Sequence, residues 1–381
     1  MEKNLRLFAL GKPLSKAAQI ELEANSLLVD DDNIKQQYKE AIGKKSKKAK
    51  KVATIEEITA AVKREVRGEN CLEGFEQGIG KVSASKLTTY RGCHFAYLLQ
   101  YRLHLQPHVY FPQVVFGECF HYILEDFNTN RLITLDDLIF GKEVQVEEDG
   151  KLKKKKIKGW KGRWYGAANS RNIRFRSEKQ LHILYNKGVG MLKDFFEKEQ
   201  HNPKPAPEFV ERKFDVMLDC RPYLNRYYRI NGFFDKIDKK NEKVIITDYK
   251  TGHVGAVSSD LGLQLTLYWY AYNKWAAQNA LYFPKQASPE NIELVMYHLP
   301  TLEEKHATRD NIALKYLINE IHNADSDIKA KNFTPFIGSH CDTACFWQES
   351  CYELLMSNNK DLFNFLISQY TNMISEKSRT Q

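Results

Sequence analysis

The chain has 381 residues, of which 43% are hydrophobic and 28% are charged, and its 57 Lys and Arg against 48 Asp and Glu give a formal net charge of +9. This composition is typical of a globular protein with two or three compact units, and the excess of positive charge favours a polyanionic partner such as nucleic acid. Its apolar runs fall short of the roughly 18 residues that a membrane-spanning helix requires, and the N-terminus lacks the apolar stretch of a signal peptide, so we expect a cytoplasmic protein.

Residues 1–80 are predicted to form a basic helical arm. Helical patterns cover Ala17 to Leu28 and Ile55 to Val66, and a lysine-rich segment, 44–51, lies between them. This segment is either a mobile or partner-docked arm or a solvated linker, because lysines without neighbouring aromatic residues bind phosphate only nonspecifically.

Residues 81–135 are predicted to form a helical segment. Ser83 can cap a first helix whose apolar face includes Leu87 and Tyr90, and a second helix covers about Val115 to Phe127. This segment also contains Cys93 and His121.

Residues 136–204 are interpreted as a basic insertion. The stretch from Glu143 to Lys158 predicts a β-hairpin that turns at Asp149-Gly150 and has one acidic and one basic arm, so pairing of opposite charges across the strands can explain its lysines. The alternative is a surface for single-stranded nucleic acid that combines charge with stacking. Its DNA-binding residues would be Lys154, Lys156, Lys158, Trp160, Lys161, Arg163 and Trp164.

The region after residue 205 changes character. Alternating apolar and polar residues between Phe209 and Gly252 predict a three-stranded antiparallel meander. A helix from Leu261 to Ala280, a strand from Ile292 to Leu299 and a helix near Arg309 to Ile328 follow. The fold class is therefore mixed α/β, with helices on either side of a central sheet. Residues 356–381 are expected to form a C-terminal helix or tail.

Two carboxylates and one ammonium group converge in this meander. Asp235 lies on the second strand and Asp248 on the third, so they can sit side by side, and Lys250 projects from the same face as Asp248. A structural ion pair is one explanation. The other is a divalent cation, Mg²⁺ or Mn²⁺, which offsets the negative charge and activates water for attack on a phosphodiester. Lys250 would then accept a proton or stabilise charge on the phosphate.

These residues belong to an ordered series of motifs: Gly117-x-x-x-His121, Glu211, Gly232-x-x-Asp235, Asp248-Tyr249-Lys250 and Gln264-x-x-x-Tyr268. The series resembles the PD-(D/E)xK nucleases of the RecB type, which include the nuclease domain of AddB and the CRISPR-associated adaptation nucleases. The resemblance covers roughly Ser83 to Tyr352. It implies a restriction-endonuclease-like nuclease core in residues 205–355.

The resemblance also implies a metal site. His121, Asp235 and Asp248 would ligate the cation, and the backbone carbonyl of Tyr249 would contribute a further oxygen. Without the other motifs, a single histidine on an apolar helix such as the one that carries His121 is more often a packed or surface residue than a ligand.

Four further residues are catalytic candidates. The resemblance implies that Lys250 activates the water. Glu211 would be either an additional acid of the site or a charge at the strand edge. Gln264 and Tyr268 lie four residues apart and therefore on one helix face, where a glutamine in an apolar run needs a buried hydrogen-bond partner. In the family this helix orients the lysine, the water or the phosphate backbone.

Three cysteines near the C-terminus, Cys341, Cys345 and Cys351, are spaced C-x₃-C-x₅-C, and Cys93 lies far upstream. Four thiolates suit a tetrahedral zinc ion or a [4Fe-4S] cluster. The layout resembles the iron-sulfur nucleases of the AddB and CRISPR-adaptation type, in which the cluster joins the C-terminal end to the N-terminal helices, although the first interval is three residues here and usually two there. The other cysteines are interpreted as ordinary thiols: Cys71, Cys119 and Cys220.

Together, the residues and the resemblance predict a metal-dependent DNA nuclease. We expect an exonuclease that acts on single-stranded or unwound DNA ends, in a process such as DNA repair. One alternative is a nuclease that trims DNA for CRISPR adaptation, and another is a non-catalytic DNA-binding scaffold that partners a helicase. Helicase motifs are not visible in the sequence, so any unwinding would belong to such a partner.

Overall fold

The computed structural model describes residues 54–67, 78–107, 109–130, 132–148, 151–203, 206–240, 243–252, 259–278, 291–336, 341, 345–348 and 350–351. The predicted helix at Ala17 to Leu28, the lysine-rich segment 44–51 and the predicted C-terminal helix or tail, 356–381, lie outside these residues. Within the described part of the chain, no helix combines the length and the apolar character that crossing a membrane requires.

The N-terminal half of the described chain is helical, as predicted. Its elements are α4 (Ile55–Arg67), α5 (Ala84–Gly92), α6 (His94–Tyr97), the π-helical turn η1 (Leu98–Arg102) and α7 (Pro112–Thr129). Ser83 caps α5, because its hydroxyl accepts a hydrogen bond from the backbone N–H of Lys86.

The insertion contains the predicted hairpin and three helices: α8 (Leu135–Phe140), β1 (Lys142–Glu148), β2 (Lys151–Ile157), α9 (Gly159–Ser170) and α10 (Glu178–His201). The hairpin register places Glu143 opposite Lys156 and Glu148 opposite Lys151, so opposite charges face each other across the strands. The long helix α10 was not predicted. Gly188 interrupts its pattern, and a Cβ at this position would lie 2.2 Å from the ring of Trp160.

A five-stranded mixed sheet forms the centre of the molecule, in the order β3-β4-β5-β6-β7. Its strands are β3 (Phe209–Asp219), β4 (Tyr227–Lys240), β5 (Lys243–Lys250), β6 (Ile292–His298) and β7 (Glu303–Ala307). The first three strands form the predicted antiparallel meander. The helix α11 (Ser259–Gln278) separates β5 from β6, which are parallel, and this connection makes the sheet mixed.

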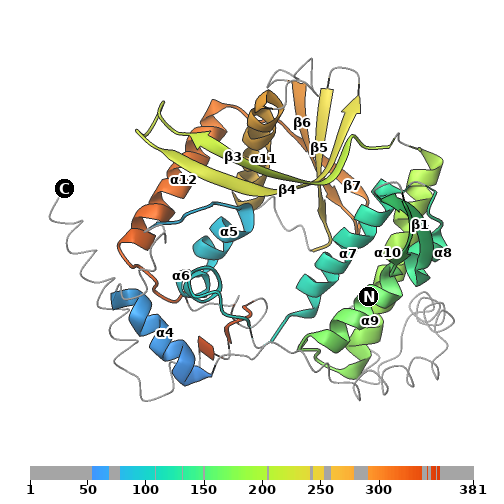
Figure 1. Cartoon of the computed structure of the whole chain (residues 1–381), viewed down its shortest axis with the longest axis horizontal. Helices are drawn as coiled ribbons and strands as arrows, with labels where there is room; N and C mark the ends of the chain where they lie inside the picture. Colours follow the sequence, from blue (N-terminus) through green and yellow to red (C-terminus); the bar gives the residue numbers. More distant parts are fainter. Residues whose placement is uncertain are drawn as a thin grey trace, which may run out of the picture.

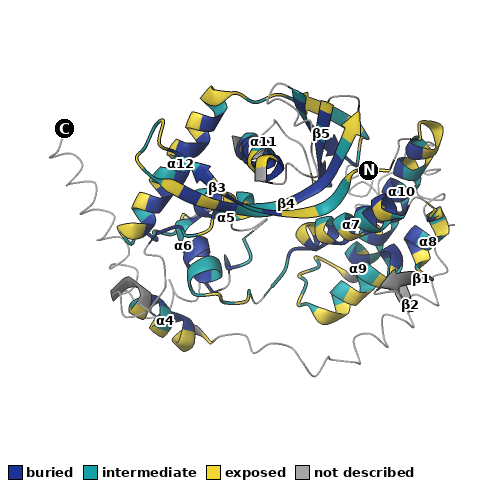
Figure 2. Cartoon of the chain, turned by 45° about the horizontal axis from the view of Figure 1, so that its top comes forward, coloured by how far each residue is buried: buried dark blue, intermediate teal, exposed yellow. Residues whose placement is uncertain are grey.

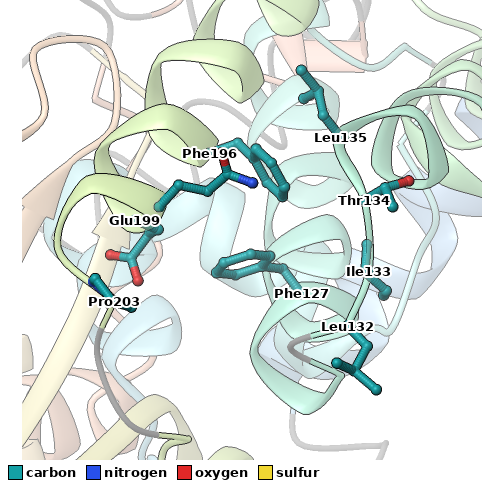
Figure 3. A pocket seen from close by; sticks show the side chains of 9 residues that line it. Phe127, Leu132, Ile133, Thr134, Leu135, Phe196, Glu199 and Pro203 are labelled. Atoms are coloured by element: carbon teal, nitrogen blue, oxygen red, sulfur yellow. The ribbon is translucent and has the colours of Figure 1, made fainter.

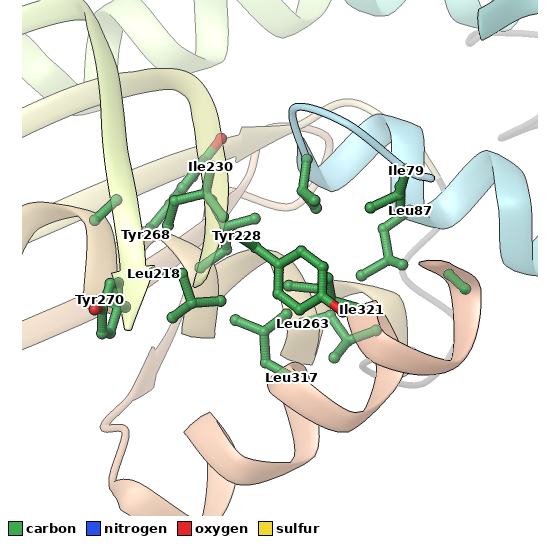
Figure 4. Close-up of a cluster of buried hydrophobic side chains, with 14 of the residues drawn as sticks. Ile79, Leu87, Leu218, Tyr228, Ile230, Leu263, Tyr268, Tyr270, Leu317 and Ile321 are labelled. Carbon is green, nitrogen blue, oxygen red and sulfur yellow. The ribbon is translucent and has the colours of Figure 1, made fainter. Parts of the chain in front are cut away.

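Helices cover the sheet from both sides (Figure 1). One side packs against α11 and α12 (Asn311–Lys329), with a core that also includes side chains of α5 (Figure 4). The other side packs α7, α9 and α10 around Tyr249 and Tyr297 of the sheet. Buried residues follow the inner faces of these layers, and exposed residues follow their outer faces (Figure 2). The structure confirms the predicted mixed α/β class with a helix-flanked sheet.

Because Leu87 of α5 and Leu317 of α12 belong to one core cluster, residues 81–135 and 205–355 do not have separate cores. The domain boundaries drawn from the sequence stay a prediction.

Candidate active site

Three acidic residues lie in a row across β3, β4 and β5. On β3, Glu211 lies between Val210 and Arg212, whose partners on β4 are the two neighbours of Asp235. Lys236 of β4 pairs with Thr247 of β5, so Asp235 and Asp248 occupy the adjacent positions on these strands. Asp235 and Asp248 are buried, with 8% and 1% of their surface exposed. The meander thus brings together the carboxylates that the sequence singled out.

His121 reaches this row from α7. Its Nδ1 lies 3.5 Å from Oδ2 of Asp235 and 3.9 Å from Oε1 of Glu211. One ligand atom from each of these three residues lies within 4.8 Å of the others, a spacing that a single metal ion can bridge. One turn earlier, Gly117 lets the helix approach the end of β5, because a Cβ there would lie 3.0 Å from Oγ1 of Thr251.

Glu211 has an unusual backbone conformation for a strand residue. Its φ of 45° lies in the left-handed region, which costs free energy for a residue other than glycine. The strand changes face here, because Phe209 and Arg212, three positions apart, both contact the ring of Trp275. The carboxylate of Glu211 is thereby turned toward His121 and Asp235.

A hydrogen-bonded network adjoins the candidate metal-binding group of His121, Glu211 and Asp235. The Lys250 Nζ lies 2.8 Å from Oδ2 of Asp248 and donates to Oε1 of Gln264 at 3.0 Å. The Nε2 of Gln264 lies 2.8 Å from Oδ1 of Asp248 and 2.9 Å from the hydroxyl of Tyr268. The glutamine that the sequence placed in an apolar helix therefore has buried polar partners and holds the lysine against the acid.

The donor set fits a hard divalent cation. Carboxylate oxygens and a histidine nitrogen suit Mg²⁺ or Mn²⁺. Oδ2 of Asp248 is buried, and its partner among the described residues is the ammonium group of Lys250 at 2.8 Å. A carboxylate oxygen has two lone pairs, so the second one is available for a cation. The backbone N–H of Tyr249 donates to Oδ2 of Asp235 at 2.9 Å and fixes that carboxylate; ligation by the Tyr249 carbonyl stays a prediction.

The acids and the bases of the site shift one another's pKa values. Burial alone would lower the pKa of His121, but the hydrogen bond with Glu211 and the charges of Asp235 and Asp248 raise it to about 9. Burial, followed by the charge of Asp248, raises the pKa of Asp235 to about 7. The pKa of Lys250 is also raised, because Asp248 outweighs the effect of burial. Without a cation, the site therefore holds protons at neutral pH.

Binding of Mn²⁺ is expected to release protons around pH 7.5. A ligating histidine must be neutral and a ligating carboxylate ionised, so the cation competes with the protons held by His121 and Asp235. Because these pKa values are about 9 and about 7, the affinity should rise with pH and level off above about pH 9. Titration calorimetry in buffers of different ionisation enthalpy counts the protons. Equal heats in every buffer would contradict this assignment of the ligands.

The predicted stacking residues of the insertion are not accessible. Trp160 and Trp164 are fully buried and stack on each other, with ring centroids 5.6 Å apart. Their indole N–H groups donate to the backbone carbonyls of Tyr185 and Leu181 at 3.0 and 3.1 Å. The prediction that these rings bind DNA bases is therefore wrong, because α10 packs over them and forms the core of the insertion.

The basic residues near these tryptophans differ in their surroundings. Arg163 is paired with Asp126 at 2.6 Å, so its charge is already neutralised. Lys158 is exposed and Lys161 is half-buried. Lys154 and Lys156 lie on β2, and their side chains are outside the described part of the structure. A role of these lysines in DNA binding stays a prediction.

The four predicted cluster cysteines come together, although Cys93 is far from the others in sequence. Cys93, Cys341, Cys345 and Cys351 line one small cavity. Burial and the neighbouring thiols raise the pKa of Cys345 to about 11 and that of Cys351 to about 12. This arrangement joins the start of α6 to the C-terminal end of the described chain.

A cavity of about 660 Å³ lies at the far end of α7, between α7 and α10 (Figure 3). Phe127, Leu132, Phe196 and Glu199 are among the residues that line it. Its lining includes neither the candidate metal-binding residues nor the four cysteines, so this cavity is not the candidate active site.

The fold and the site together define the class of metal-dependent nucleases. Residues 81–352 match the profile of the PD-(D/E)XK nuclease superfamily, and the chain belongs to this superfamily. No curated protein matches the chain. Among solved structures, the one titled "Crystal structure of SSO0001" is similar over 48% of this chain and 76% of that chain, with 16% identity and a TM-score of 0.26.

Proposed function

We propose that this protein is a Mg²⁺- or Mn²⁺-dependent deoxyribonuclease that degrades single-stranded or unwound DNA from its ends. One observation carries the proposal: His121, Glu211 and Asp235 gather their ligand atoms within 4.8 Å, beside the ion pair of Asp248 and Lys250. The net charge of +9 favours a polyanionic substrate. Exonuclease action is favoured over site-specific cleavage because the sequence offers no base-reading module.

Each residue has a distinct role in the proposed reaction. His121, Asp235 and Asp248 would hold the cation, which supplies water activation and charge neutralisation when bound. Lys250 stabilises negative charge on the attacked phosphate, a role that its raised pKa favours over proton acceptance. Glu211 is half-buried and belongs to the same group of ligand atoms, so it would be either an additional acidic ligand or the acceptor for the proton of the attacking water.

Replacing Gln264 with leucine is expected to lower kcat by about 10- to 100-fold with a smaller effect on Mn²⁺ affinity. Gln264 links Asp248, Lys250 and Tyr268, and leucine keeps most of its volume but removes every hydrogen bond. Steady-state cleavage rates and Mn²⁺ titrations separate the two effects. A kcat equal to that of the wild type would show that Gln264 does not position Lys250.

We also propose that Cys93, Cys341, Cys345 and Cys351 hold a [4Fe-4S] cluster with a structural role. A tetrahedral zinc site with bonds of about 2.3 Å needs sulfur atoms roughly 3.8 Å apart. Among the described residues, no three of these sulfur atoms lie within 4.8 Å of one another. This wider spacing favours a [4Fe-4S] cluster over a single zinc ion. The cluster would close the long loop between Cys93 and Cys341 and fasten the helices to the sheet.

Digestion of 5′- and 3′-labelled single-stranded, duplex and circular DNA by anaerobically purified protein tests the proposal. We expect linear single strands to be shortened in Mg²⁺ or Mn²⁺, and circles and blunt duplexes to resist. Cleavage of circular DNA would show that the protein is an endonuclease, because circles have no ends. Binding without any cleavage, in wild-type protein with full iron content, would instead support a scaffold that partners a helicase.

A further inference from the structure

Two exposed residues lie next to the metal-binding group. Lys213 and Phe233 are paired across β3 and β4, two positions along the strands from Glu211 and Asp235. Lys213 is exposed, and Phe233 exposes 50% of its surface. Within the described part of the chain, neither has an ion pair, a hydrogen bond from its side chain or a ring contact. The exposed ring of Phe233 is therefore available to contact a ligand beside the candidate site.

The two side chains point to the side from which His121 approaches. Their strand neighbours Phe214 and Phe234 pack against each other on the opposite side, in the core with α11, at a centroid distance of 4.6 Å. Successive strand residues alternate in direction, so Lys213 and Phe233 face away from that core. Because α7 packs on this other side, the pair lies on the same open approach as His121.

The charges along this face single out Lys213. The next pair of positions carries Asp215, which binds Arg229 at 2.6 and 3.0 Å and Lys81 at 3.3 Å. Asp215 thus holds both cations in ion pairs and offsets one of their two charges. Lys213, in contrast, has no ion-pair partner among the described residues, and it lies two positions along β3 from Glu211.

We propose that Phe233 and Lys213 bind the nucleotide adjacent to the scissile phosphate. The ring of Phe233 stacks on the face of an unpaired base, and the ammonium group of Lys213 neutralises the neighbouring phosphate. Two residues along a strand span about 7 Å, a distance that one nucleotide can bridge. In a duplex both faces of a base are covered by its neighbours, so this pair selects single strands. The inference rests on the proposed function and assigns its substrate preference to two residues.

The replacement Phe233→Ala tests this assignment. With Ca²⁺ in place of Mg²⁺, we expect its affinity for a single-stranded oligonucleotide, measured by fluorescence anisotropy, to fall by about 5- to 100-fold. In Mg²⁺, KM for single strands should rise, whereas cleavage of bis(p-nitrophenyl) phosphate, which has no base, should be unchanged. Phe233→Trp keeps a stacking ring and should behave as the wild type. Phe140→Ala removes another exposed aromatic ring, 61% exposed on α8, and is the matched control.

The salt dependence of DNA binding tests the role of Lys213. Lys213→Ala is expected to reduce the slope of log affinity against log salt by about one unit for single strands. Lys305→Ala, an exposed lysine on β7, should leave the slope unchanged. The inference is overturned if Phe233→Ala binds single strands as tightly as the wild type, or if the tryptophan variant loses as much affinity as the alanine variant. Failure of the proposed function looks different, because the wild type itself would then cleave neither DNA nor the aryl diester.

Discussion

Replacing Asp248 with asparagine is expected to reduce DNA cleavage in Mg²⁺ by about a thousandfold or more, with the fold intact. Asparagine has nearly the same shape and keeps an oxygen for the hydrogen bond from Gln264. It removes the charge that holds Lys250 and leaves one fewer anionic ligand for the cation. Asp248 therefore affects both metal binding and the position of Lys250. Its replacement should reduce DNA cleavage more than the replacement of Gln264.

Cleavage rates of labelled single strands under single-turnover conditions measure this effect, and thermal unfolding checks the fold. Asp219→Asn is the matched control, because Asp219 ends β3 in a surface ion pair with Arg221 and should tolerate the change. An Asp248→Asn enzyme within tenfold of the wild-type rate would remove this aspartate from the catalytic site.

Replacing Cys93 with serine is expected to abolish iron binding and to lower the midpoint of thermal unfolding by about 10 °C or more. Cys93 directly precedes α6 and accepts a hydrogen bond from the backbone N–H of Phe336 at 3.4 Å, so it lies where the helical segment meets the C-terminal region. Loss of the cluster would release this junction. The broad absorbance near 400 nm of anaerobically purified protein should disappear together with stability and nuclease activity.

The control for this effect is Cys220→Ala. Cys220 is fully buried but lies outside the cysteine cavity, so its replacement costs packing and leaves the iron content unchanged. Stoichiometric zinc with no iron in the wild-type protein would contradict the iron-sulfur cluster. It would still support a metal site that joins the helical segment to the C-terminal region. A Cys93→Ser protein with wild-type stability and metal content would contradict both.

The sequence predicted the relative positions of several candidate-site residues correctly because their motifs are local. Asp248 and Lys250 share one short strand, and Gln264 shares one helix face with Tyr268, so simple spacing places their side chains correctly. The approach of His121 to Asp235 depends on the packing of α7 against the sheet, and only the family resemblance indicated it before the fold was known.

Features that depend on long-range packing were missed. Trp160 and Trp164 follow a lysine-rich strand and match the composition of a nucleic-acid surface, but they are buried by α10, which contacts them from residues 17 to 25 positions away. The glycine at 188, which weakens the helical pattern, makes room for one of these rings. Local composition could not distinguish a stacking surface from a core.

Phe233 was missed for a different reason. In the run Gly232-Phe233-Phe234-Asp235 the two phenylalanines have the same propensity for a strand, and only the register shows that Phe234 enters the core whereas Phe233 remains exposed. The left-handed backbone of Glu211 likewise has no signal in its residue type.

A crystal structure of the protein soaked with Mn²⁺, with anomalous diffraction at the manganese edge, tests the central claim most directly. We predict an anomalous peak about 2.0 to 2.3 Å from the His121 ring and from the carboxylates of Asp235 and Asp248, and loss of that peak in Asp248→Asn protein. A peak bound elsewhere, or a fully ordered site in which His121 turns away from both carboxylates, would contradict the account.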